Sequence, residues 1–73
     1  MNKKVYFTEE PRHCEICYEP LDQSFVNGQT TDGHHAIMCT NSYTVHGYGN
    51  LFGVGFGQLF VRDDDGRFIK HLG

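Results

Sequence analysis

The segment Cys14-Glu15-Ile16-Cys17 opens the part of the sequence that decides the fold. Twenty-one residues separate it from Cys39, and His46 follows seven positions later. All three cysteines of the chain lie within residues 14–46. Thiolates at Cys-x-x-Cys spacing can reach one metal ion when the intervening backbone forms a tight knuckle, as it does in zinc ribbons. The segment therefore predicts a metal site that joins two distant parts of the chain.

Four side chains are predicted to bind one Zn²⁺: Cys14, Cys17, Cys39 and His46. A second Cys-x-x-Cys knuckle would need a cysteine at position 42, where the chain has Ser42. A serine hydroxyl must lose a proton to compete with thiolate or imidazole, so serine is a poor zinc ligand at neutral pH. Imidazole suits zinc well, and His46 is the nearest downstream imidazole. The alternatives for the fourth position are water and two histidines that precede Cys39, His34 and His35.

The size of the chain also favours a metal. Its 73 residues predict one small domain, 1–73. At this length a folded chain buries only roughly 60–65% of the surface that its unfolded form exposes, so the core alone leaves stability marginal. An odd number of cysteines would leave one thiol over in a disulfide framework. The sequence therefore favours a metal, with free thiols buried like small apolar side chains as the alternative.

Charge and hydropathy limit the partners and the compartment. The formal net charge is −3 and the isoelectric point is about 5.9, which argues against non-specific binding to nucleic acid. The first residues do not resemble a signal peptide, and no apolar run approaches the length of a membrane span. We expect a reducing, cytoplasmic location, where paired cysteines bind metal more often than each other.

The first half of the chain predicts short strands and two turns. Residues 4–8 are rich in β-branched and aromatic side chains and predict a strand that ends before Pro11. Asn27-Gly28 lies between residues that favour strands and suits a type I′ hairpin turn. A second turn is predicted at Asp32-Gly33, and residues 34–38 predict an extended approach to Cys39.

The second half predicts one short helix, a glycine-rich loop and a hairpin. The helix candidate is the segment Thr40 to Val45, which is one or two turns long. In the loop 47–57 the glycines are expected to allow close backbone approach, while four side chains fill the core: Leu51, Phe52, Val54 and Phe56. Residues 58–72 predict a hairpin whose solvated tip is 63–66.

Together these elements predict a small mainly-β domain, either β or α+β, of zinc-ribbon-like type. It has short hairpins, glycine-rich loops and at most one short helix. The metal-site region is 14–46, and the C-terminal hairpin is 58–72. No repeat or linker divides the chain.

The chain resembles a group of small, mostly uncharacterised bacteriophage- and prophage-encoded proteins with a Cys-x-x-Cys motif. The likeness covers about residues 14 to 70 and departs at Ser42, where a fourth cysteine would stand. The resemblance implies a phage or prophage origin, and it brings no biochemical activity with it. The segments that carry it are Cys14-x-x-Cys17, Ser24 to Thr30, Gly33 to Cys39, Gly53-x-Gly55-x-Gly57-Gln58-Leu59-Phe60, and Gly66 to Lys70.

Three kinds of function fit these features. The first is a zinc-stabilised, non-enzymatic protein that binds a protein partner, since six Phe and four Tyr are more than so small a core can hide. If the phage resemblance holds, that partner would be a host or phage protein, such as a host enzyme or a defence factor that this protein would inhibit. The oligomeric state is open, and a homodimer is one of the options.

The second kind of function is a nucleic-acid-binding zinc ribbon. Its cationic side chains would be drawn from Arg12, His13, Lys70 and His71. The third is a small enzyme. It would use Cys39 with His35 as nucleophile and base, or a catalytic zinc with an open fourth position. The short chain argues against a deep pocket for such an enzyme.

Overall fold

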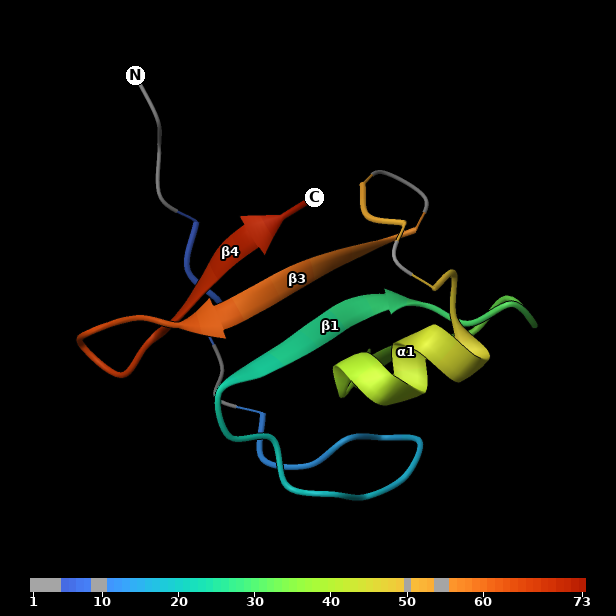
Figure 1. Cartoon of the computed structure of the whole chain (residues 1–73), viewed down its shortest axis with the longest axis horizontal. Helices are drawn as coiled ribbons and strands as arrows, with labels where there is room; N and C mark the ends of the chain where they lie inside the picture. Colours follow the sequence, from blue (N-terminus) through green and yellow to red (C-terminus); the bar gives the residue numbers. More distant parts are fainter. Residues whose placement is uncertain (1–4, 9–10, 50, 54–55) are drawn as a thin grey trace.

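A computed structural model of the chain describes residues 5–8, 11–49, 51–53 and 56–73. One antiparallel sheet and one helix make up its regular structure (Figure 1). The strand order is β2-β1-β3-β4. This is the small, mainly-β fold with one short helix that the sequence predicted. The elements in chain order are β1 (Ser24–Gln29), β2 (His35–Met38), α1 (Thr40–His46), β3 (Gly57–Arg62) and β4 (Phe68–Leu72).

An aromatic cluster fills one face of the sheet. Phe25 of β1 and Phe60 of β3 are paired residues in the ladder, and their rings stack with centroids 5.1 Å apart. Phe7, from the N-terminal segment, and Phe68 of β4 meet Phe25 edge-on at 4.9 and 4.7 Å. Phe25 is completely buried. This cluster ties the N-terminal segment and β4 to the centre of the sheet.

The helix α1 covers the opposite face (Figure 1). Val26 of β1 and Met38 of β2 are ladder partners there, and both are completely buried. Tyr43 of α1 packs on the same face and is 1% exposed, and its hydroxyl donates a 2.6 Å hydrogen bond to the carbonyl of Leu51. Among the described residues, no helix is long and apolar enough to cross a membrane.

Both outer strands are covered by irregular segments. Next to β2, the amide of Glu15 donates to the carbonyl of Ile37, and the Glu15 carboxylate accepts from the Ile37 amide at 2.6 Å. Beside β4, the amide of Phe7 donates to the carbonyl of Phe68 at 3.0 Å. Where a longer strand was predicted, the structure has a single bridge between Tyr6 and Ile69, and residue 4 lies outside the described residues. Covered edges are protected from pairing with other chains.

The turn predicted at Asn27-Gly28 is wrong. Both residues lie inside β1, and Gly28 pairs with β2 on one side and β3 on the other. A Cβ at Gly28 would lie 3.0 Å from both the Phe56 carbonyl oxygen and the Tyr43 ring. The glycine is therefore needed for close approach and not for a turn. The chain turns instead at the second predicted site, where Gly33 has φ of 94°.

The glycine-rich loop fills the core less than predicted. Phe52 packs on Tyr43 with ring centroids 5.4 Å apart. Leu51 is 52% exposed and Phe56 is 39% exposed, so the prediction that they are core residues is wrong. Val54 lies outside the described residues. Tyr43, supplied by α1, takes the buried position that these side chains were expected to fill.

Phe25→Ala should destabilise the protein by about 3–5 kcal/mol, because a fully buried ring in contact with three others is lost and a cavity remains. Urea unfolding followed by circular dichroism measures this change. Phe56→Ala is the matched control, and it should cost about 1 kcal/mol or less because its ring is partly exposed. Equal losses in the two variants would contradict this description of the core.

Candidate metal centre

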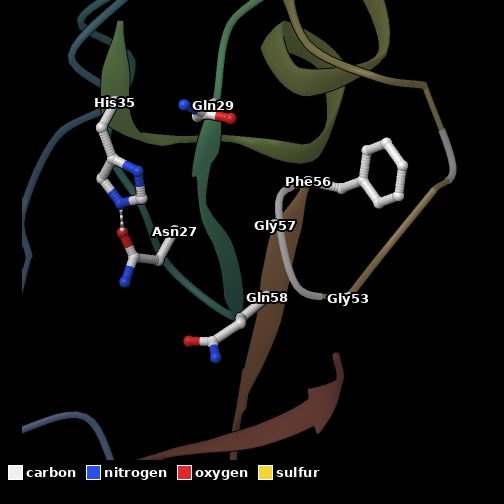
Figure 2. Close-up of a pocket in the computed structure, with 7 residues that line it drawn as sticks. All are labelled: Asn27, Gln29, His35, Gly53, Phe56, Gly57 and Gln58. Atoms are coloured by element: carbon white, nitrogen blue, oxygen red, sulfur yellow. Dashed lines mark hydrogen bonds between the residues drawn. The ribbon is translucent and has the colours of Figure 1, made fainter.

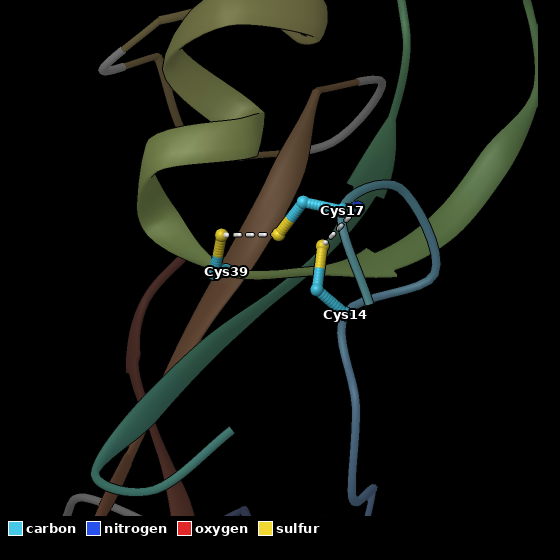
Figure 3. Close-up of side chains that lie close together, drawn as sticks. All are labelled: Cys14, Cys17 and Cys39. Atoms are coloured by element: carbon cyan, nitrogen blue, oxygen red, sulfur yellow. Dashed lines mark hydrogen bonds between the residues drawn. The ribbon is translucent and has the colours of Figure 1, made fainter. Parts of the chain in front are cut away.

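Three sulfur atoms meet between the Cys14–Cys17 turn and the first turn of α1 (Figure 3). The Sγ atoms of Cys14, Cys17 and Cys39 all lie within 4.8 Å of one another, and those of Cys17 and Cys39 are 3.7 Å apart. All three are free thiols in this structure. Cys14 is buried, Cys17 is exposed and Cys39 is between the two. The three predicted sulfur ligands therefore form one group that could hold a metal ion.

The Cys14–Cys17 segment is a tight knuckle at the tip of a short hairpin. The amide of Leu21 donates to the carbonyl of Arg12, which closes the base of this hairpin. At the tip, the amides of Ile16 and Cys17 donate to the Cys14 sulfur at 3.3 and 3.4 Å. The turn ends at Tyr18, whose φ of 64° lies in the left-handed region. Two amide donors aimed at one sulfur stabilise its thiolate form.

The third sulfur comes from the residue that caps α1. Cys39 has an extended backbone, and its Sγ accepts a 3.4 Å hydrogen bond from the amide of Ser42. The Ser42 Oγ lies 3.3 Å from the Cys39 sulfur and 3.4 Å from the Cys14 sulfur. The first helical turn thus does what a second loop knuckle does in a ribbon with two Cys-x-x-Cys pairs.

His46 is not part of the sulfur group. It lies at the last position of α1, and a helix of seven residues is about 10 Å long, so its imidazole and the Cys39 sulfur sit at opposite ends. The backbone carbonyl of His46 accepts a hydrogen bond from the amide of Thr31. The place beside the sulfurs that was assigned to His46 is taken by Ser42. The Cys39-x-x-Ser42 spacing is the feature of the sequence that pointed to Ser42. It was set aside in the prediction because a hydroxyl is a poor zinc ligand.

The two other histidines considered as ligands are engaged elsewhere. His34 lies 3.2 Å from the carboxylate of Asp32. The Nε2 of His35 lies 2.6 Å from the side-chain oxygen of Asn27 (Figure 2). His35 is four residues before Cys39 on an extended strand, about 13 Å along the chain. The pairing of Cys39 with His35 as nucleophile and base is therefore not formed.

The Cys14 and Cys17 thiols have pKa values shifted in opposite directions. Burial raises the pKa of Cys14, but hydrogen bonds from the Cys17 amide and from Ser42 outweigh it, and the pKa falls from 9.0 to about 6. For Cys17, bonds from the Glu19 amide and from Ser42 lower the pKa, while burial and the neighbouring Cys14 and Cys39 sulfurs raise it, and the net shift is upward. Cys14 therefore carries a negative charge more readily than Cys17 when no metal is bound.

A cavity of about 420 Å³ lies beside β1 and the start of β3 (Figure 2). Asn27 and Gln29 follow Phe25 at alternate positions of β1, and Gln58 is the ladder partner of Asn27. This site was not predicted from the sequence, although the alternation of Phe25 with two amides was its signal. Among the described residues that line it there is no Asp, Glu, Lys or Arg; they are Asn27, Gln29, His35, Gly53, Phe56, Gly57 and Gln58.

In the metal-free protein, the Cys14 thiolate should form near pH 6, and this step should be absent from Cys14→Ser. A thiol whose pKa falls on folding adds stability that is complete above its unfolded pKa of 9.0 and is lost as the pH drops through about 6. The advantage in melting temperature of the wild type over Cys14→Ser should therefore grow between these pH values. Thiolate absorbance and thermal melts measure the two effects. An absorbance step unchanged in Cys14→Ser would contradict the assignment.

Comparison with known proteins adds no family. No family model matches the chain, and no curated protein or solved structure matches it with significance.

Proposed function

We propose that the protein binds one Zn²⁺ through Cys14, Cys17 and Cys39 and is a zinc-stabilised, non-enzymatic binding protein. The grouping of the three sulfurs carries this proposal. Zinc–sulfur bonds of about 2.3 Å in a tetrahedral site place neighbouring sulfurs about 3.8 Å apart. The Cys17 and Cys39 sulfurs are 3.7 Å apart. Little rearrangement is then needed to receive the ion.

Zinc would cross-link two parts of the chain that are separated by twenty-one residues in the sequence. Cys14 and Cys17 belong to the knuckle, whereas Cys39 begins the helix that covers the sheet. Because the unfolded chain has no preformed site, the free energy of zinc binding adds to the free energy of folding. Three thiolates must stay reduced to hold the ion, which favours a cytoplasmic, reducing compartment for the protein.

The uncharged cavity and its surroundings support a protein partner. Amides and an imidazole line it, and the exposed side chains of Leu51 and Phe56 belong to the loop beside it. Interface centres are poor in charged residues and rich in aromatic ones. The likeness to bacteriophage-encoded proteins implies a bacterial host protein as that partner.

The arginines give less support to the nucleic-acid alternative. Arg62 donates to the carbonyls of Asp22 and Gly66, and its guanidinium lies 4.2 Å from the Phe68 ring centroid. Arg67 stacks on the Tyr6 ring at 4.0 Å. Both guanidinium groups thus take part in the fold, and the net charge of −3 repels phosphates.

Native mass spectrometry should find one zinc per chain, and Cys39→Ser should lose it, because two sulfurs cannot hold the ion against a chelator. His46→Ala should keep zinc, since His46 lies away from the sulfurs. A chelator should lower the melting temperature of the wild type and of His46→Ala, but not that of Cys39→Ser. A metal-free wild type whose melting is unchanged by chelator would overturn the zinc proposal.

Phe56→Ala should weaken binding to a host protein captured by the wild type at least tenfold, measured by surface plasmon resonance with the purified partner. Val5→Ala is the matched control, because Val5 is similarly exposed but lies beside β4, next to Lys70. Binding to random-sequence DNA should be negligible at about 0.15 M salt. Tight DNA binding that falls steeply with salt would favour the nucleic-acid alternative instead.

A further inference from the structure

The hydroxyl of Ser42 lies against the sulfur group from the inside of the protein. Its Oγ is 3.4 Å from the Cys14 sulfur and 3.3 Å from the Cys39 sulfur. The hydroxyl also acts to lower the pKa of Cys17, although the net pKa shift of that thiol is upward. Ser42 is only 4% exposed. One buried oxygen therefore lies against the Cys14 and Cys39 sulfurs and influences the third.

These distances match the edges of a tetrahedral zinc site with one oxygen ligand. With zinc–sulfur bonds of about 2.3 Å and a zinc–oxygen bond of about 2.0–2.1 Å, sulfur and oxygen ligands lie about 3.5 Å apart. The Ser42 oxygen lies 3.4 and 3.3 Å from the Cys14 and Cys39 sulfurs, and the Cys17 and Cys39 sulfurs are 3.7 Å apart. A hydroxyl bonded to a single thiol would satisfy one of these distances, whereas a ligand at the fourth corner satisfies all of them.

The position of Ser42 on α1 fixes this arrangement. Ser42 is three residues after the capping Cys39, and its amide donates to the Cys39 sulfur. This bond sets the first helical turn so that both side chains point toward the knuckle. The neighbouring Thr40 and Asn41 are exposed.

We infer that Ser42 supplies the fourth ligand of a site with three sulfurs and one oxygen, an inference that rests on the proposed zinc binding. Three thiolates already outweigh the charge of Zn²⁺ and leave the site at −1. A second excess negative charge is unfavourable, so the serine keeps its proton and binds as a neutral hydroxyl. Zinc then displaces protons from the thiols only. A neutral oxygen is a weaker ligand than thiolate or imidazole, so Ser42 would be the ligand most readily replaced by another molecule.

The test replaces zinc by Co²⁺, whose visible and near-ultraviolet spectrum reports geometry and the number of bound sulfurs. Ser42→Cys should give a four-sulfur spectrum, with sulfur-to-cobalt charge transfer about one third stronger than in the wild type, and should bind zinc at least tenfold more tightly. Asn41→Cys is the matched control, since it adds a thiol one residue away on the exposed side of α1, and it should keep the three-sulfur spectrum.

Ser42→Ala and imidazole distinguish the serine from a bound water. Imidazole at millimolar concentration should shift the cobalt spectrum of Ser42→Ala, where the corner is open, at least tenfold more readily than that of the wild type. Equal shifts in both proteins would mean that water holds the corner and would overturn the inference, as would identical three-sulfur spectra for Ser42→Cys and Asn41→Cys. A wild type that binds neither cobalt nor zinc would instead refute the proposed function.

Discussion

Three sulfur atoms held within 4.8 Å of one another cannot all be negatively charged unless a cation lies among them. The acidities of the metal-free protein show this constraint. Amide and hydroxyl donors lower the pKa of Cys14 to about 6, while the neighbouring sulfurs help to raise that of Cys17. A divalent cation removes this conflict and lets every sulfur become a thiolate. The fold brings together three thiols whose thiolate forms repel one another, and a bound metal ion would remove this repulsion.

The rest of the structure positions these sulfurs. Glu15 bonds to Ile37 of β2 through both its amide and its carboxylate, which fixes the knuckle beside the sheet. Tyr43 packs on the sheet from α1 and so fixes the helix that carries Cys39 and Ser42. The knuckle at the outer edge of β2 and the helix over one face of the sheet thus meet at the sulfur group. Precise placement by packed neighbours is what keeps ligands at bonding distances.

The two faces of the sheet carry different kinds of side chain. The face toward α1 is a closed core that supports the sulfur group. The opposite face begins as the aromatic cluster around Phe25 and continues, two and four residues along β1, as the amides of Asn27 and Gln29. This end of the sheet carries the cavity and lies next to the exposed Leu51 and Phe56. The sulfur group and the cavity therefore lie on separate parts of the molecule.

The sequence alone predicted several of the local elements and the three cysteines that come together. The spacing of Cys14 and Cys17, the short helix after Cys39 and the hairpin around 63–66 all depend on neighbours in the chain, so pattern was sufficient. Gly28 misled the turn prediction because the need for glycine there comes from Tyr43 and Phe56, which are distant in sequence. His46 was preferred over Ser42 because the residue type shows how strong a ligand is. The distance of His46 from Cys39 along the helix and the burial of the Ser42 hydroxyl against the sulfur group cannot be read from the sequence. Only the tertiary structure decided those positions, since they follow from packing between segments and not from the residues themselves.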